Sequence, residues 1–372
     1  MRIENVQILM KDGVFRKGSV EFDNKIQKVE VNETTDKKAS QYLIPGLVDV
    51  HTHGALGGDH TDVSYEQMKN ISSFYAKNGT TSFLATTLSA TEEALAKAMC
   101  KMNAYKEFSD GARYLGINLE GPFFSHPKRG AHPTKLLQLP SIPMFERLYR
   151  LSGEQIKMVC IAPELDGGME FIKKVSQVCR ISLAHSTADY KTAMKAFENG
   201  ATHVTHLFNG MNSFLHREPG IIGAALDSNA FVEVICDGYH LHPAVIRAIF
   251  KMFSDRACLI SDSIKCTGQP DGDDEFAGLP VTITQGKVML KDGSTLAGSS
   301  ISLLQGVRIA VSLGIPLAQA VMAASASGAR ALGMEEEIGT IQTGAYADMI
   351  LLDHDLQIVK VFINGQEVRL TL

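Results

Sequence analysis

Eight short apolar segments, each followed by a stretch with helical periodicity, constrain the fold of this 372-residue chain more than any other feature. Each segment has the length of a buried strand, and the stretches between them are long enough to cross back over a sheet. Eight parallel strands that alternate with helices close into a (β/α)8 barrel, so we predict an α/β, TIM-like barrel. The predicted strands cover residues 47–50, 81–87, 114–120, 158–164, 181–185, 203–209, 231–237 and 257–262.

The two ends of the chain follow a different pattern. Residues 1–45 contain short alternating strands separated by Asp-Gly and Asp-Asn turns, and residues 338–372 contain similar strands with an Asn-Gly turn. Neither segment can cover both faces of a sheet alone, so we expect both to form one small β-sandwich domain. The predicted division is a β-sandwich domain of residues 1–45 and 338–372 and a barrel of residues 46–337.

Composition excludes several classes of partner. The net charge of −5 and the sequence pI near 6.2 provide no basic surface for nucleic acid or anionic lipid. No apolar run approaches the roughly 18 residues that a membrane span requires, and the start of the sequence lacks a signal-peptide pattern. The six scattered cysteines form no C-x-x-C motif and are predicted to be reduced. We therefore expect a cytoplasmic protein with a small-molecule ligand and no nucleic-acid or membrane partner.

Side chains that can bind metals end five of the predicted strands. Because strand side chains alternate between faces, His51 and His53 after the first strand point to the same side. In a barrel the ends of the strands meet at the C-terminal face, where this fold builds its active sites. Imidazole and carboxylate donors without thiolate suit one or two Zn²⁺, Fe²⁺, Mn²⁺ or Co²⁺ ions. The candidate ligands are His51, His53, Glu120, His185, His206 and Asp262.

An isolated His-x-His is a weak signal, and each single histidine could equally be a buried core residue. The candidate ligands recur at the same end of five predicted strands, and this favours a catalytic metal centre over buried core histidines whose hydrogen bonds are satisfied. A non-catalytic protein built on an enzyme fold remains the alternative from a different class, and it predicts a broken set of ligands.

The His-x-His, the later single histidines, the strand-eight aspartate and the split β-domain resemble the amidohydrolase superfamily. Within it, five ordered motifs resemble the N-acetylglucosamine-6-phosphate deacetylase family, and the resemblance spans nearly the whole chain. It implies metal-dependent hydrolysis of the acetamide of N-acetyl-D-glucosamine 6-phosphate to D-glucosamine 6-phosphate and acetate. The motifs are Leu119-Glu-Gly-Pro-Phe, Lys128-Arg-Gly-Ala-His, Thr205-His-Leu-Phe-Asn-Gly-Met, His216-Arg-Glu-Pro-Gly and Asp237-Gly-Tyr-His.

The resemblance also implies which residues act. Glu120, His185 and His206 hold the principal ion, and His51 and His53 place the chain with members that carry a second ion bridged by Glu120. The general acid/base is Asp262, and His132 polarises the scissile carbonyl. The implied substrate contacts are Asn209 and the backbone of Gly210, His240, the backbone of Leu296 and Ala297, and Arg217 from a neighbouring subunit, which makes a homodimer the minimum assembly.

Other activities remain open from the sequence. A deacetylase of N-acetylgalactosamine 6-phosphate differs only in the orientation of one hydroxyl group. Dihydroorotases, hydantoinases and deaminases share the fold, but many cyclic-amide enzymes use a carboxylated lysine where this chain has Glu120. Strand eight departs from the family, because Ser261-Asp-Ser-Ile-Lys-Cys-Thr-Gly replaces a small, alanine-rich loop.

Three further segments carry structural predictions. Residues 121–139, with several prolines, glycines and cations, are expected to form either a lid or an ordinary surface loop. Residues 268–278, rich in Asp and Gly, have the composition of a mobile loop beside the site. Residues 317–332 are predicted to form one helix.

Overall fold

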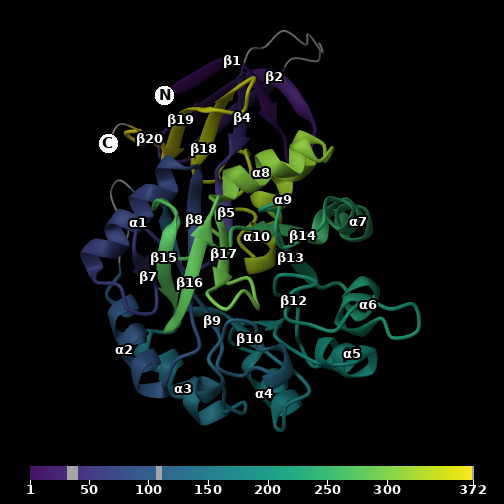
Figure 1. Cartoon of the computed structure of the whole chain (residues 1–372). Coiled ribbons are helices and arrows are strands. Elements are labelled where there is room, and N and C mark those ends of the chain that lie inside the picture. Colours follow the sequence, from purple (N-terminus) through teal and green to yellow (C-terminus); the bar gives the residue numbers. More distant parts are fainter. Residues whose placement is uncertain (32–40, 106–110, 371–372) are drawn as a thin grey trace.

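The computed structural model describes residues 1–31, 41–105 and 111–370. Its central sheet has eight parallel strands in the order β14-β13-β12-β11-β10-β9-β8-β5, ringed by helices (Figure 1). This arrangement confirms the predicted (β/α)8 barrel. The strands are β5 (Leu47–Thr52), β8 (Thr80–Thr87), β9 (Arg113–Glu120), β10 (Ile156–Ile161), β11 (Arg180–Leu183), β12 (His203–Val204), β13 (Phe231–Ile235) and β14 (Ala257–Ile260).

Backbone hydrogen bonds between the end of β5, with the residue that follows it, and the segment that follows β14 close the mouth of the barrel. The amide of Asp262 donates to the carbonyl of His51 at 3.0 Å, and the amide of His53 donates to the carbonyl of Ser263 at 2.7 Å. The closing seam therefore holds a predicted catalytic aspartate beside two predicted metal ligands.

The helices bury one apolar face against the barrel. Helix α1 shows how the sequence sets such an element: Ser64 and Gln67 form a capping box at its start, and Met68, Ile71 and Tyr75 are buried. No helix in the described part of the chain is long and apolar enough to cross a membrane. The barrel helices are α1 (Tyr65–Lys77), α2 (Glu92–Asn103), α3 (Ile142–Leu151), α4 (Gly168–Val175), α5 (Tyr190–Glu198), α6 (Gly220–Asp227), α7 (Pro243–Phe253) and α8 (Leu303–Ser312).

The predicted single helix over residues 317–332 is wrong, because the chain forms two helices there. Helix α9 (Leu317–Ala324) and helix α10 (Ala326–Leu332) meet at Ser325, whose backbone angles, φ −134° and ψ −81°, are not helical. The Ser325 hydroxyl donates to the carbonyl of Val321 at 2.7 Å. A serine that bonds back to its own helix is a known cause of a bend, and the apolar pattern does not reveal it.

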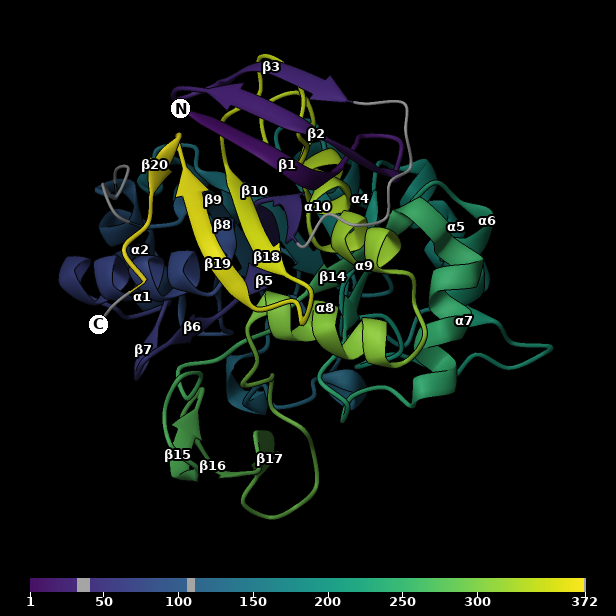
Figure 2. The ribbon, with the colours of Figure 1, turned by 90° about the horizontal axis from the view of Figure 1, so that it is seen from above.

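Strands from both ends of the chain form one seven-stranded sheet with a core of its own (Figure 2). The terminal segments therefore combine as predicted, whereas the exact division at residues 45 and 338 stays a prediction. The order is β20-β19-β18-β4-β1-β2-β3. The strands are β1 (Arg2–Leu9), β2 (Phe15–Phe22), β3 (Ile26–Val31), β4 (Gln41–Pro45), β18 (Met349–Asp353), β19 (Ile358–Ile363) and β20 (Gln366–Glu367).

A small antiparallel sheet replaces part of the predicted loop at residues 268–278. Strand β15 (Gly272–Phe276) pairs with β16 (Leu279–Thr284), which pairs with β17 (Lys287–Leu290). Phe276 and Ile283 face a buried cluster shared with Leu88 of the barrel. The sheet lies in front of the barrel strands in Figure 1 and projects from one side of the barrel in Figure 2. Two further strands of two residues each, β6 (Gly54–Ala55) and β7 (Gly58–Asp59), follow β5 and pair with each other.

Candidate metal centre and active site

Three of the predicted site residues lie two positions beyond their strands in a left-handed backbone conformation. The φ angles of His185, His206 and Asp262 are 46°, 26° and 49°. This conformation costs about 1–2 kcal/mol for a residue other than glycine and is found preferentially at functional sites. All three side chains line one cavity at the barrel mouth.

Glu120, at the end of β9, lies between two pairs of histidines. Its Oε1 is 3.3 Å from His206 Nε2 and 3.4 Å from His185 Nε2. Its Oε2 is 3.2 Å from His53 Nε2, and its Oε1 is 3.6 Å from His51 Nε2. Two sets of three donors result, and the donor atoms of each set lie within 4.8 Å of one another. Glu120 belongs to both sets.

The set of Glu120, His185 and His206 fits a divalent cation. His185 donates from Nδ1 to the carbonyl of Lys128 at 2.8 Å, and His206 donates from Nδ1 to the carbonyl of Asn209 at 3.2 Å. A neutral imidazole with its hydrogen on Nδ1 carries a lone pair on Nε2. The two Nε2 atoms are only 3.1 Å apart, so their lone pairs and the carboxylate repel one another unless a cation lies between them.

The second set is built around the seam of the barrel. The Nε2 atoms of His51 and His53 are 3.3 Å apart, and Asp262 Oδ1 lies 3.4 Å and 3.3 Å from them. His51 donates from Nδ1 to Glu233 Oε2 at 2.8 Å, which again leaves the Nε2 lone pair facing the other donors.

The charges of the site favour a bound cation. Burial raises the pKa of Glu120, but His51, His185 and His206 outweigh this effect and hold the pKa well below its ordinary value. Burial lowers the pKa of His53, yet Asp262 and Glu120 raise it overall to about 9. The buried carboxylates thus stabilise positive charge at the point where the donors converge.

A cavity of about 210 Å³ opens over the donors, and the segment of residues 121–139 supplies one wall of it. This segment contains two short 3-10 turns, η1 (His126–Lys128) and η2 (Thr134–Leu136), and the amide of Ser125 donates to the carbonyl of His185 at 2.9 Å. His132, from the same segment, places Nε2 3.7 Å from Glu120 Oε2. Burial lowers the pKa of His132 to about 3, so its ring is neutral at pH 7.

Four of the six predicted substrate contacts line this cavity, namely Asn209, Gly210, His240 and Leu296. Ala297 is buried beside it but does not line it. Arg217 is exposed on the segment that precedes α6, where its guanidinium contacts His216. Arg217 is not among the residues that line the cavity of its own chain. The segment that precedes α6 projects from the body of the molecule (Figures 1 and 2).

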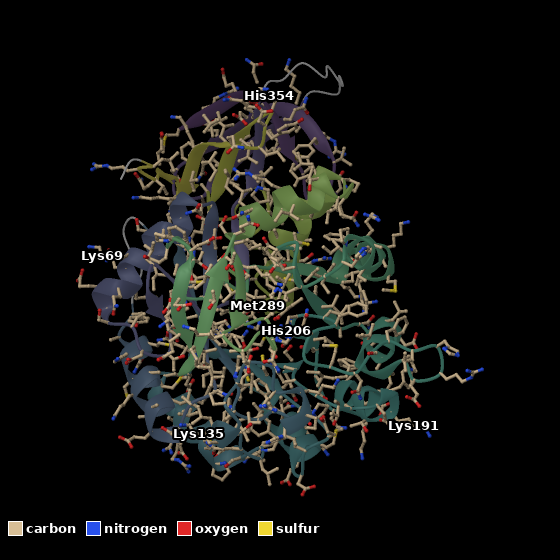
Figure 3. The ribbon with its side chains drawn as sticks, in the orientation of Figure 1. Lys69, Lys135, Lys191, His206, Met289 and His354 are labelled. Carbon is tan, nitrogen blue, oxygen red and sulfur yellow. The ribbon has the colours of Figure 1, made fainter. Side chains whose placement is uncertain are left out.

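Sequence reasoning missed several residues of the site. Glu233 is 1% exposed and contacts His51, and Asp237 Oδ2 accepts from His240 Nδ1 at 2.7 Å. Phe276, on β15, forms part of the cavity wall and packs its ring edge-on against His53. A lone carboxylate within the apolar run 231–235 was the only available signal for Glu233. Figure 3 places His206 near the centre of the view, whereas Lys69, Lys135 and Lys191 point outward at the periphery.

The fold and the donor set define a metal-dependent hydrolase, and residues 42–368 match the model of the amidohydrolase family. The chain belongs to this family. It is similar to the N-acetylglucosamine-6-phosphate deacetylase of Vibrio furnissii, with 36% identity over 88% of this chain and 82% of that protein. It is 32% identical to the N-acetylgalactosamine-6-phosphate deacetylase of Escherichia coli O157:H7 over 98% and 95% of the two chains.

A solved structure shows the same architecture. A mutant N-acetyl-D-glucosamine-6-phosphate deacetylase from Mycobacterium smegmatis, in complex with N-acetyl-D-glucosamine 6-phosphate, superposes with a TM-score of 0.92. The two chains are 29% identical, and the match covers 99% of each. Because the match covers nearly all of each chain, the two proteins share the seven-stranded terminal sheet as well as the barrel.

Proposed function

We propose that this chain hydrolyses the acetamide of N-acetyl-D-glucosamine 6-phosphate to D-glucosamine 6-phosphate and acetate. The observation that carries the proposal is the convergence, in one cavity, of the Glu120-centred donors with Asp262 and His132. The two relatives named above act on epimeric substrates, and the glucosamine epimer is favoured by the larger number of similar relatives that carry that name.

Glu120, His185 and His206 would hold the principal divalent ion, and His51 and His53 a second one; Zn²⁺, Fe²⁺, Mn²⁺ and Co²⁺ all suit these donors. When bound, the cation supplies Lewis acidity and lowers the pKa of adjacent water to about 7. The residues of the chain perform the rest of the reaction.

Asp262 is the proton carrier. Burial raises its pKa, but His53 and His51 outweigh this effect and lower it overall, so the carboxylate is ionised at neutral pH. It accepts a proton from the water that attacks the acetamide carbon and transfers that proton to the departing nitrogen. His132, neutral and buried, donates a hydrogen bond to the carbonyl oxygen as negative charge develops there. The carbon–nitrogen bond breaks, and acetate and the amine leave.

The phosphate would bind where Asn209, Gly210 and His240 line the cavity. His240 is held by Asp237, which also accepts from the amide of His240 at 2.9 Å. Asn209 and the backbone of Gly210 stand beside it on the cavity wall and can donate further hydrogen bonds.

Arg217 would complete the phosphate site across a homodimer interface. The segment that carries it projects from the chain, and its neighbours Phe214 and Leu215 are 44% and 50% exposed. Exposed apolar side chains on a projecting segment suit burial against a second subunit. The planar guanidinium of Arg217 can then bind phosphate with two parallel hydrogen bonds.

Steady-state kinetics of acetate release test the proposal. We expect turnover of N-acetylglucosamine 6-phosphate, weaker turnover of the galactosamine epimer, and a loss of at least about 100-fold in kcat/KM for unphosphorylated N-acetylglucosamine, because charge-assisted contacts to phosphate are lost. Equal efficiency on the unphosphorylated sugar would disprove the phosphate site. A preference for the galactosamine epimer would reassign the substrate.

A further inference from the structure

Glu233 is a buried carboxylate to which the proposed reaction assigns no step. It lies in the middle of β13, is 1% exposed, and points into the barrel beneath the donors. Its Oε2 accepts from His51 Nδ1 at 2.8 Å and from the backbone amide of His206 at 3.2 Å. Its Oε1 is buried and has no hydrogen-bond partner among the described residues.

The contact with Glu233 determines what His51 can bind. A carboxylate that accepts from Nδ1 fixes the hydrogen on that atom and directs the lone pair of Nε2 toward His53 and Glu120. The Nδ1 atom of His53 has no partner in the described part of the chain. Among the described residues, His51 is therefore the histidine of this pair whose Nδ1 is held by a hydrogen bond to a side chain.

The charge balance points in the same direction. Glu120, Asp262 and Glu233 are three buried carboxylates in contact with the same group of histidines. One divalent ion does not neutralise the three negative charges of these carboxylates, whereas a second divalent ion supplies the positive charge that is missing. The bond to the His206 amide places Glu233 between the two donor sets, so one oxygen atom connects them.

We propose that Glu233 is a positioning residue, which orients His51 so that His51 and His53 can hold the second divalent ion of the proposed function. This inference rests on the metal centre of the proposed function. Glu233 touches neither ion nor substrate. It acts through the orientation of the His51 ring and through the negative charge that it adds behind that ring.

Metal binding to chelator-treated protein tests the inference without any assay of activity. Purified wild type, Glu233→Gln and Glu233→Leu are titrated with Mn²⁺, bound ions are counted by elemental analysis, and electron paramagnetic resonance distinguishes an exchange-coupled pair from a single ion. We expect two coupled ions in wild type. We expect the second ion to bind about 10- to 100-fold more weakly in Glu233→Leu, with a smaller loss in Glu233→Gln, whose amide oxygen can still accept from His51.

Asn118→Leu is the matched control. Asn118 is a buried polar residue that donates to the carbonyl of Val50 at 3.2 Å, on the same strand as His51, and accepts from Cys160 Sγ. Its side-chain hydrogen bonds among the described residues involve no metal-ligand side chain. This variant should keep two ions. The inference is overturned if wild type binds one ion, if Glu233→Leu binds the second ion as tightly as wild type, or if Asn118→Leu loses it equally. Wild type that binds no ion would instead refute the metal centre itself. If Glu233→Leu does not fold, Glu233→Gln alone decides.

Discussion

The role of Asp262 can be tested separately from metal binding, because Asp262, unlike Glu120, belongs to neither set of three donors. Among the described residues, its carboxylate forms ion-pair contacts with His51 and His53 and is not part of the set of Glu120, His185 and His206, so its replacement leaves that set complete. We expect Asp262→Asn to retain bound metal and to lose about 10²- to 10⁴-fold in kcat, because the amide cannot accept a proton. Acetate release and elemental analysis measure the two effects.

The control for this variant is Asp62→Asn, which removes an exposed carboxylate that pairs with Lys101 on the surface. It should turn over like wild type. If Asp262→Asn kept more than about a tenth of wild-type turnover, the assignment of the proton carrier would be wrong.

A buried histidine that belongs to neither donor set gives a prediction on acid stability. Burial lowers the pKa of His203 to about 3, and Arg180 adds to this effect. Below pH 6.5 the unfolded chain takes up a proton at this position and the folded chain does not, so stability falls toward pH 3 by about 1.4 kcal/mol per pH unit. His203→Gln removes this loss. We expect its deficit in unfolding free energy relative to wild type to narrow by about 2 kcal/mol between pH 6.5 and 5, measured by urea denaturation. Parallel stability curves would contradict the shifted pKa.

The sequence reveals the roles of the site residues at strand ends but not the role of Glu233. The positions of His51, Glu120 and Asp262 follow from strand periodicity and from the rule that barrel sites lie at strand ends. Glu233 could not be assigned in this way, because the sequence does not show which residues of the seventh strand face the centre. The contact depends on the ring orientation of His51, which is a three-dimensional property.

At the scale of elements, long periodic segments were predictable and local exceptions were not. Helix α7 (Pro243–Phe253) starts with a proline, which is favoured at the first helical position, and buries an apolar face that includes Ile246 and Phe250. The sheet of β15 to β17 was missed because its Asp- and Gly-rich start resembles a loop. Phe276 and Ile283 belong to a buried cluster that includes the distant Leu88, and such packing is not visible in a short window of sequence.

This small sheet is expected to matter for turnover through Phe276. The ring forms part of the cavity wall and lies edge-on to His53, with 5.9 Å between ring centroids. Phe276→Ala opens the cavity to water and should lower kcat/KM by about 10-fold, because electrostatic interactions in the site weaken when water enters. Thr284→Ala, at an exposed position of β16, should leave kcat/KM unchanged. Equal values for both variants would show that the sheet does not enclose the reaction.

At the scale of the whole molecule, the seven-stranded terminal sheet and the metal centre lie at opposite ends of β9. Arg113, the first residue of β9, donates to Asp348 at 3.3 Å and stacks over Tyr346, whereas Glu120 at the other end of β9 joins the metal centre. The barrel and the shared terminal sheet were predictable, because eight alternating units and two incomplete β-segments leave few other ways to bury their apolar faces. The assembly of subunits was not, because a single chain carries only half of an interface.

Complementation between two inactive variants tests that assembly. In the proposed homodimer each cavity uses Asp262 of one subunit and Arg217 of the other. We expect Arg217→Ala and Asp262→Asn to be weakly active or inactive when alone. A mixed dimer contains one cavity with both native residues, so dimers re-formed from an equal mixture should recover about one quarter of wild-type activity. If Arg217 served its own subunit, every cavity in the mixture would lack one of the two residues, and no activity would return. Lys in place of Arg217 keeps the charge but not the planar pair of donors, so Arg217→Lys should recover only part of the loss in KM.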